Sequence, residues 1–283
     1  MGQGQFSADI SPAGHCHAVM VRSPYPHAKI RAIDISQAMA LPGVIAVLTG
    51  ADAAVDGLGP IPHNPDWVGP PDATLRLPPD FDVYVTENTA LPLDTVRYVG
   101  EAVAMVVAET VAAANDAAEL VDVDYDVLPA VVHARAAMAP GAPLVWPACS
   151  ENLALTCDVG DEEATERAFA NAAHIVKFDG WIHRVTGSPM EPRAVVGEYD
   201  PTDGRYTLRT GSGAGVVRSR ERLAVTLGVP MENCRAVFGD MGGNFGTRNA
   251  FFPEYALMPW AAKRVGRAVK WTATRQECFL SDY

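Results

Sequence analysis

Apolar and polar residues alternate along several short stretches of the chain, and a period of two is typical of half-buried β-strands. Residues 29–35 show this alternation, whereas residues 96–107 contain an apolar core suited to a buried strand. Runs that are bounded by capping residues predict helices. The predicted strands are residues 16–22, 29–35, 44–48, 96–107, 121–127, 174–182, 194–199, 206–210, 234–238 and 269–272, and the predicted helices are residues 36–41, 111–120, 162–172, 216–227, 253–265 and 274–280.

Start and stop signals bound these helices. Thr110 and Asp161 stand where a side-chain oxygen can accept a hydrogen bond from a free N–H of the first turn. Gly228 and Gly266 each follow a predicted helix, and glycine commonly ends a helix because it adopts positive φ without strain. The strand, helix, strand order with short connections predicts an α+β fold.

A change in amino-acid composition and a loss of periodicity divide the chain. Residues 136–150 include an Ala- and Pro-rich stretch without periodicity, and we predict a linker there between a first domain over residues 1–135 and a second over residues 151–283. Within the first domain, residues 52–94 carry many prolines among Gly and Asp. A loop of this length is either functional or a poorly ordered insertion, and composition does not decide between the two.

The composition excludes some functions and compartments. The 283 residues are 48% hydrophobic and 20% charged, which is ordinary for a globular protein. A net charge of −12 argues against binding to nucleic acid or to an anionic membrane surface. The longest strongly apolar run, residues 102–108, is too short to span a bilayer, and the first residues have no signal-peptide pattern. The five cysteines form no Cys-x-x-Cys pair, so we expect reduced thiols, no metal ligand set and a cytoplasmic location.

The strongest local motif is the glycine-rich run at residues 239–246, directly after a predicted strand. Glycines allow the main chain to approach a ligand closely, and successive N–H groups can form a nest for anionic or oxo groups. The run matches neither a Walker phosphate loop nor a dinucleotide fingerprint. It is either a ligand site or a tight strand-to-helix connection in which Phe245 fills the core.

Two further loops in the second domain are candidates. Residues 188–193 place Glu191 and Arg193 two residues apart between prolines, where the two side chains orient a ligand or tie two loops together. Residues 211–215 are glycine-rich and precede a predicted helix. They either bind an anion by donating hydrogen bonds from their free N–H groups, or only provide a flexible entry to the helix.

Taken together, the chain resembles the molybdenum-binding large subunit of the xanthine dehydrogenase, aldehyde oxidase and carbon monoxide dehydrogenase family. Four stretches carry the resemblance in the family's order, which is more specific than any one of them. The first two are similar to the start and close of the family's α/β hammerhead domain, and the last two to the first part of its molybdopterin-binding domain. They are residues 22–28 with 41–44, residues 96–104 with 123–130, residues 189–193 with 227–230, and residues 242–248 (Gly-Gly-Asn-Phe-Gly-Thr-Arg).

The resemblance implies a fold, a chemistry and a site. The fold is α+β, an N-terminal α/β hammerhead domain followed by the first part of a molybdopterin-binding α+β domain. The chemistry is hydroxylation of a carbon by water at a molybdenum–pterin centre, whose pterin is expected in the cytosine dinucleotide form. The expected cofactor-binding residues are Gly242, Gly243, Asn244, Phe245, Gly246 and Arg248.

Three positions depart from the family's pattern. Many members have a Gln that contacts an oxygen on molybdenum, and it aligns with Val185, with His183 as a possible substitute. A second Gln of the pre-helix loop corresponds to Ala214. Purine-oxidising members carry Glu where this chain has Asn249, which argues against xanthine as the substrate.

The length also departs from the family. The general-base Glu lies in a C-terminal portion that this sequence does not contain, so we expect no catalytic residue here and no activity of the chain alone. The sequence is then a split subunit or a fragment. Its expected partners are a C-terminal molybdenum-domain chain or segment, an iron–sulfur small subunit with 2Fe–2S clusters, an FAD medium subunit and a small-molecule substrate. The alternative is a non-catalytic binding or assembly module that keeps the fold without the molybdenum centre.

Overall fold

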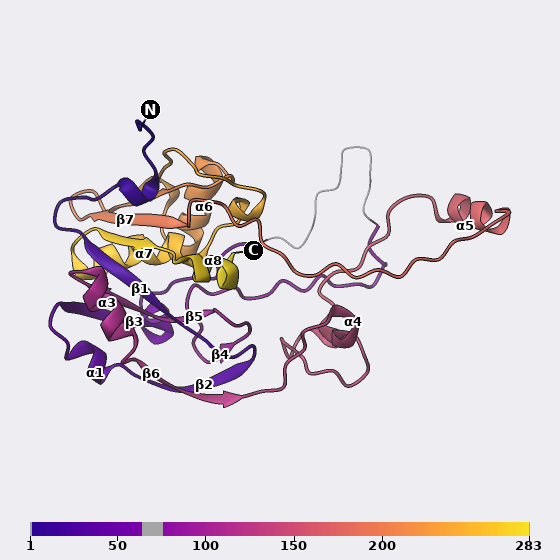
Figure 1. The fold of residues 1–283 in the computed structure, drawn as a ribbon, viewed down its shortest axis with the longest axis horizontal. Helices are drawn as coiled ribbons and strands as arrows, with labels where there is room; N and C mark the ends of the chain where they lie inside the picture. Colours follow the sequence, from indigo (N-terminus) through magenta and orange to yellow (C-terminus); the bar gives the residue numbers. More distant parts are fainter. Residues whose placement is uncertain (1, 64–75, 283) are drawn as a thin grey trace. The chain divides into compact units, whose positions relative to one another are not determined.

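A computed structural model describes residues 2–63 and 76–282 (Figure 1). Its strands are β1 (Cys16–Arg22), β2 (Ala28–Asp34), β3 (Val44–Thr49), β4 (Thr95–Val96), β5 (Ala102–Ala108), β6 (Asp122–Val127), β7 (Ala194–Asp200), β8 (Arg205–Thr210), β9 (Cys234–Val237) and β10 (Val269–Thr272). Its α-helices are α1 (Ser36–Met39), α2 (Gly50–Val55), α3 (Val111–Ala118), α4 (Ala134–Ala137), α5 (Glu162–Ala170), α6 (Val216–Leu227), α7 (Pro253–Val265) and α8 (Arg275–Ser281). Short 3₁₀ helices occupy Ser7–Asp9, Ser150–Asn152, Met231–Asn233 and Thr247–Asn249.

The described residues separate into two compact units. The first contains residues up to Pro62, Glu87–Ala130 and the residues from Thr186 onward, and the second contains His63–Thr86 and Val131–Val185. Every strand lies in the first unit, and the second holds α4, α5 and the 3₁₀ turn Ser150–Asn152.

A seven-stranded mixed sheet forms the centre of the first unit, in the order β3-β5-β1-β10-β7-β8-β9. It joins strands from both predicted domains, because β1 pairs in parallel with β10. A smaller antiparallel sheet has the order β4-β2-β6. The α+β class predicted from the sequence is confirmed, whereas the domain boundaries at residues 135 and 151 stay a prediction.

β5 is buried on both faces of the large sheet. All seven of its residues are buried. Met105 and Val107 belong to the main core, which also contains the buried residues of α7, whereas Ala104 and Val106 belong to a second core formed with α3. Because successive strand residues face opposite sides, the apolar run seen in the sequence is the signature of a strand with a helix on each face.

Most predicted elements and their caps are present. The Thr110 hydroxyl accepts a hydrogen bond from the N–H of Ala113, and the Asp161 carboxylate accepts one from Ala164. Gly228 and Gly266 end α6 and α7 with φ values of 64° and 67°, in the left-handed region predicted for them. Among the described helices, none combines the length and the apolar character that a membrane span requires.

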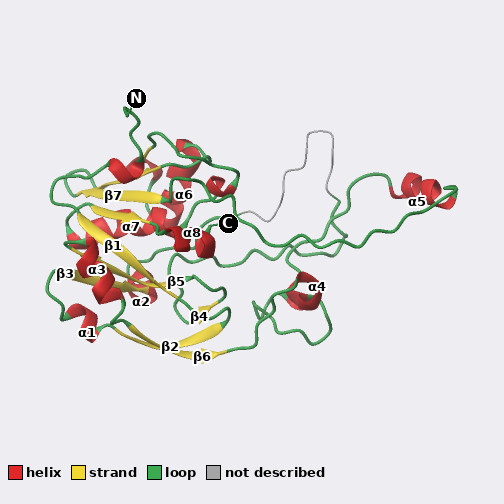
Figure 2. Ribbon diagram, in the orientation of Figure 1, coloured by secondary structure: helices red, strands yellow, loops and turns green. Residues whose placement is uncertain are grey.

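Two sequence expectations need correction, and a third stays open. Residues 174–182 form no strand and belong to a loop without regular secondary structure (Figure 2). The predicted strand at residues 96–107 divides into β4 and β5, because the chain turns at Gly100 with a φ of 95°. The proline-rich stretch at residues 52–94 begins with α2, and its residues 64–75 lie outside the described part, so its interpretation as a functional loop or a poorly ordered insertion stays open.

The turn between β4 and β5 contains a half-buried carboxyl group. Glu101 accepts a hydrogen bond from the main-chain N–H of Arg97 at 2.6 Å. Burial raises the pKa of Glu101 to about 7, although the hydrogen bond from Arg97 and the charge of that residue lower it. Glu101 therefore binds a proton in the folded state at a pH at which it is ionised in the unfolded chain.

We expect the variant E101Q to be more stable than the wild type at pH 8, by about 3 kcal/mol, and to differ little near pH 4.5. The wild type loses stability as pH rises from about 4.5 to about 7, because only the unfolded state releases the proton of Glu101 in that interval. A glutamine carries no such proton. Urea unfolding at both pH values measures the difference, with E119Q at an exposed position as the control. An E101Q protein less stable than wild type at pH 8 would contradict this account.

Candidate cofactor site

The glycine-rich run follows β9 and leads into the 3₁₀ turn Thr247–Asn249 and α7. We call residues 239–246 the glycine loop. Asp240 anchors its start, because its carboxylate accepts a hydrogen bond from the N–H of Gln5 at 2.8 Å. Gly243 and Gly246 have φ values of 117° and 88°, and Phe245 has 52°. Two of the glycines are therefore required by the backbone conformation, since other residues rarely adopt such angles.

Asn244 organises the tip of the glycine loop. Its side-chain oxygen accepts hydrogen bonds from the N–H groups of Gly246 and Arg248, each at 3.2 Å. Its main-chain oxygen accepts one from the Thr247 hydroxyl at 3.0 Å, and its amide donates to Asn249 at 2.9 Å. Asn244 thus holds the turn closed from within, and Asn249, the departure from purine-oxidising members, belongs to this local network.

Glu191 joins the second predicted motif to the glycine loop. Its carboxylate accepts a hydrogen bond from the N–H of Gly242 at 2.7 Å, and its own N–H donates to the Gly242 carbonyl at 3.4 Å. A Cβ at Gly242 would lie 2.5 Å from the Cβ of Glu191, so only glycine allows this approach.

Arg248 also contacts Glu191. The side chain of Arg248 is 1% exposed, and its guanidinium donates to the Glu191 carbonyl and lies 3.5 Å from the carboxylate. Within the described residues, its Nε atom is buried and has no hydrogen-bond partner. The guanidinium therefore joins the end of the motif at residues 242–248 to the Glu191 segment, and a direct contact with a cofactor stays a prediction.

The remaining part of the glycine loop is open. No described residue accepts a hydrogen bond from the main-chain N–H of Gly243, Asn244 or Phe245. The side chain of Phe245 is 73% exposed, so the interpretation in which this residue fills the core is wrong. Three consecutive N–H groups beside an exposed aromatic ring match the donor set that an anionic or oxo-bearing group requires, and the residues present fit a pterin cofactor.

Residues 211–215, the glycine-rich loop before α6, pack against the 3₁₀ turn Thr247–Asn249. Ser212 Oγ donates to the main-chain oxygen of Arg248 at 3.1 Å, and the N–H of Gly213 donates to the same oxygen at 2.9 Å. A Cβ at Gly213 would lie 2.0 Å from the amide nitrogen of Asn244. The pre-helix loop is therefore a support for the glycine loop, and Ala214 lies beside it, its N–H bonded to Ser212 Oγ at 3.2 Å.

Arg193 does not pair with Glu191 but enters a buried ionic network. Its guanidinium donates to Glu254 at 2.8 Å and to Asp282 at 2.7 Å, and Arg22 donates to the other oxygen of Glu254 at 2.8 Å. Burial would raise the pKa of Glu254, but the charges of Arg193 and Arg22 outweigh burial and lower it to about 2. Glu254 is thus a buried anion that joins three segments distant in sequence.

Sequence analysis did not identify Glu254. The available signal was a single carboxylate within the apolar run of residues 251–262, because a buried charge in such a helix needs a cationic partner. The partner itself could not have been named, since Arg22 and Arg193 lie 232 and 61 residues away.

The two side chains that were considered for a molybdenum contact lie in the second unit. Val185 is 87% exposed, and the ring of His183 accepts a hydrogen bond from the Trp181 indole at 3.3 Å. The glycine loop belongs to the first unit. A role for His183 in place of the missing Gln therefore stays a prediction.

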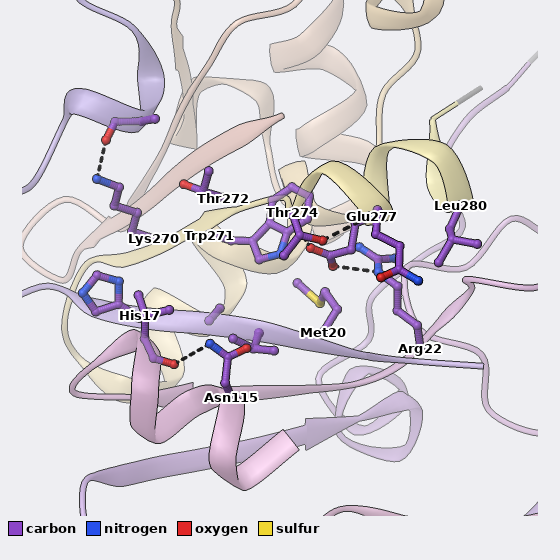
Figure 3. A pocket seen from close by; sticks show the side chains of 15 residues that line it. His17, Met20, Arg22, Asn115, Lys270, Trp271, Thr272, Thr274, Glu277 and Leu280 are labelled. Atoms are coloured by element: carbon purple, nitrogen blue, oxygen red, sulfur yellow. Dashed lines mark hydrogen bonds and ion pairs between the residues drawn. The ribbon is translucent and has the colours of Figure 1, made fainter. Parts of the chain in front are cut away.

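A separate cavity of about 630 Å³ lies beside β1, β10 and α8 (Figure 3). His17, Lys270 and Trp271 line it, and none of the predicted cofactor-binding residues does. Arg22 and Glu277 also line the cavity, and their side chains are 2.8 Å apart. Because Arg22 donates to Glu254 as well, the cavity borders the buried ionic network. Burial lowers the pKa of Lys270, whose ammonium donates to the Ala8 carbonyl at 2.6 Å.

Two family models match this chain. A family model of the aldehyde oxidase and xanthine dehydrogenase a/b hammerhead domain matches residues 1–68 and 79–129, and a model of the molybdopterin cofactor-binding domain matches residues 145–283. The second match contains the glycine loop and the segment with Glu191.

Individual relatives show the same family. The chain is 32% identical to the 6-hydroxypseudooxynicotine dehydrogenase complex subunit gamma of Paenarthrobacter nicotinovorans, over 99% of this chain and 33% of the relative. It is 31% identical to the carbon monoxide dehydrogenase large chain of Hydrogenophaga pseudoflava, over 100% of this chain and 35% of that one. Quinoline 2-oxidoreductase from Pseudomonas putida 86 has a similar structure, with a TM-score of 0.80 and 32% identity over 98% of this chain and 33% of its own.

The chain spans about a third of the length of the curated relatives it matches. It belongs to the xanthine dehydrogenase, aldehyde oxidase and carbon monoxide dehydrogenase family, and it corresponds to the N-terminal part of the family's molybdenum-binding large subunit.

Proposed function

We propose that this chain forms the N-terminal portion of the large subunit of a cytoplasmic molybdenum hydroxylase. The enzyme oxidises an aldehyde, an N-heterocycle or carbon monoxide with oxygen from water. Electrons leave through 2Fe–2S and FAD subunits, and the chain has no activity without the remaining part of the large subunit. The observation that supports this proposal most strongly is the open row of N–H groups at Gly243, Asn244 and Phe245 beside an exposed aromatic ring.

The residues of this chain would bind and orient the cofactor. The N–H groups of Gly243, Asn244 and Phe245 would donate hydrogen bonds to its oxo and pterin oxygens, and the Phe245 ring would cover one side and exclude water. Glu191 and Arg248 would hold the glycine loop in position. When bound, the molybdenum–pterin group, expected in the cytosine dinucleotide form, supplies the redox chemistry that no side chain here provides.

We expect replacement of Gly243 by Val to remove the metal and the activity while the fold persists. The new Cβ would lie 2.8 Å from the Phe245 ring and 3.2 Å from the Cβ of Pro189, at a φ of 117° that Val does not adopt. A displacement of about 1 Å costs about 100-fold in turnover. Molybdenum analysis and turnover of the purified complex, with the thermal midpoint as a check of folding, measure the effect.

G14V is the matched control, because Gly14 also has positive φ, at 68°, but a Cβ there meets nothing within 4 Å. It should retain metal and turnover. A G243V complex with wild-type molybdenum content would contradict a cofactor contact at the glycine loop.

The alternative, a non-catalytic binding or assembly module, predicts a folded complex that contains no molybdenum and is indifferent to either variant. Molybdenum near one atom per large subunit in the wild-type complex would exclude it.

A further inference from the structure

Residues 174–182, which we call the exposed segment, have the composition of a β-strand but pair with nothing in the described structure. The segment reads His-Ile-Val-Lys-Phe-Asp-Gly-Trp-Ile and contains β-branched and aromatic residues typical of strands. Its main chain makes no hydrogen bond to any described residue. Figure 2 shows it as part of the long loop after α5. An extended main chain with unpaired N–H and C=O groups can add to the edge of a sheet.

Three apolar side chains of the segment are almost fully exposed. Val176, Phe178 and Ile182 are 91%, 92% and 91% exposed, and in an extended chain these even-numbered positions share one face. Ile175 and Trp181, on the opposite face, are 54% and 59% exposed. The Trp181 ring lies 5.2 Å from the ring of His133. The Asp179 side chain, at another odd-numbered position, is 83% exposed. Partial cover within the unit is therefore confined to Ile175 and Trp181, and the three even-numbered apolar side chains have almost none.

Three large apolar side chains on one fully exposed face are unusual for a surface that remains in water. Burial of such a face, together with pairing of the main chain, is the contribution that a strand makes to a sheet. The strand predicted at these positions would then form only when a neighbouring strand is supplied from elsewhere.

The lengths of the relatives indicate where that neighbour comes from. The relatives match this chain over 99–100% of its residues but extend over about three times its length. The exposed segment lies within the range that matches the cofactor-binding domain. Nine residues after Ile182 comes Glu191, whose carboxylate accepts a hydrogen bond from the glycine loop. A strand that docks here would also fix the entry to the Glu191 contact.

We propose that the exposed segment adds as a β-strand to a sheet edge in the remaining part of the large subunit, with Val176, Phe178 and Ile182 facing that part's core. The proposal rests on the proposed function, because it takes its partner from the family's large subunit. Its test measures the protection of main-chain amides from hydrogen exchange, and that protection does not require molybdenum.

Hydrogen exchange of the assembled large subunit, followed by mass spectrometry, tests this pairing. We expect amides of residues 174–182 to exchange about 100-fold or more slowly than unprotected amides, as in a paired strand. The variant F178D should lose most of this protection, because a carboxylate would be placed in the core of the partner. F169D is the matched control, since Phe169 is an exposed phenylalanine of α5, nine residues away and 54% exposed, and its protection should equal that of wild type.

Exchange of residues 174–182 at the unprotected rate in the assembled subunit would overturn the proposal. So would equal effects of F178D and F169D, or protection that appears in this chain alone and rises with its concentration, because the partner would then be a second copy. Molybdenum content, measured on the same samples, separates the two claims: protection without molybdenum refutes the proposed function and keeps the strand.

Discussion

Replacement of Glu254 by Gln is expected to destabilise the protein by about 3–5 kcal/mol at pH 7, which is a large part of the stability of a typical domain. Glu254 is 1% exposed and accepts hydrogen bonds from Arg193 and Arg22, whose side chains are 0% and 10% exposed. Glutamine keeps the volume but removes the charge, and it leaves two buried guanidinium groups without their shared anion. Urea unfolding of the purified protein measures the loss.

E198Q is the matched control in the same unit. Glu198 pairs with Arg209 at 2.6 Å, but the two side chains are 32% and 28% exposed, and solvent screens the pair. We expect a loss below about 1 kcal/mol. Equal losses in E254Q and E198Q would show that the buried network contributes no more than a surface pair.

Glu254 also contributes to the acid sensitivity of the protein. The pKa of Glu254 is about 2 in the folded state and near 4.5 in the unfolded chain, so its stabilisation is complete above about pH 4.5 and is lost as pH falls toward 2. The difference between wild type and E254Q should therefore shrink across that interval. Because Arg193 is two residues from Glu191, we also expect E254Q to loosen the tie to the glycine loop and to lower cofactor retention.

The second large effect is expected at Gly197, where replacement by Ala should cost about 4 kcal/mol or prevent folding. Gly197 lies in β7 beneath α7, and a Cβ there would be 2.1 Å from the carbonyl carbon of Met258 and 2.2 Å from the nitrogen of Pro259. These are main-chain atoms of a buried helix, so no side chain can rotate away. Soluble yield and the urea midpoint measure the effect.

G211A is the control for Gly197, because the nearest atom to a Cβ at Gly211 is the flexible Cγ of Met241 at 3.4 Å. Its cost should stay below about 1 kcal/mol. A G197A protein that unfolds at the wild-type midpoint would show that α7 does not approach β7 so closely.

Local patterns predicted the elements that depend on local chemistry. The N-caps Thr110 and Asp161 and the stops Gly228 and Gly266 are correct because a cap involves only neighbouring main-chain groups. Residues 174–182 were wrong as a strand, because a strand needs a second strand and periodicity does not say whether one is present. The break at Gly100 was missed for a similar reason: the apolar run hides a turn that only the positive φ reveals.

For the candidate site, the sequence by itself identified the loop that we propose as the cofactor site. Residues 242–248 carry both the motif that resembles the family's and the glycines that the backbone requires. Only the tertiary structure decided how that loop is held. Glu191, Arg248, Gly213 and Asn244 come together across up to 57 residues, and Glu254 joins Arg22 to Arg193 across still longer separations. The physical reason is that hydrogen bonds and ion pairs between distant segments depend on the path of the sheet, which brings β1, β7 and β10 side by side.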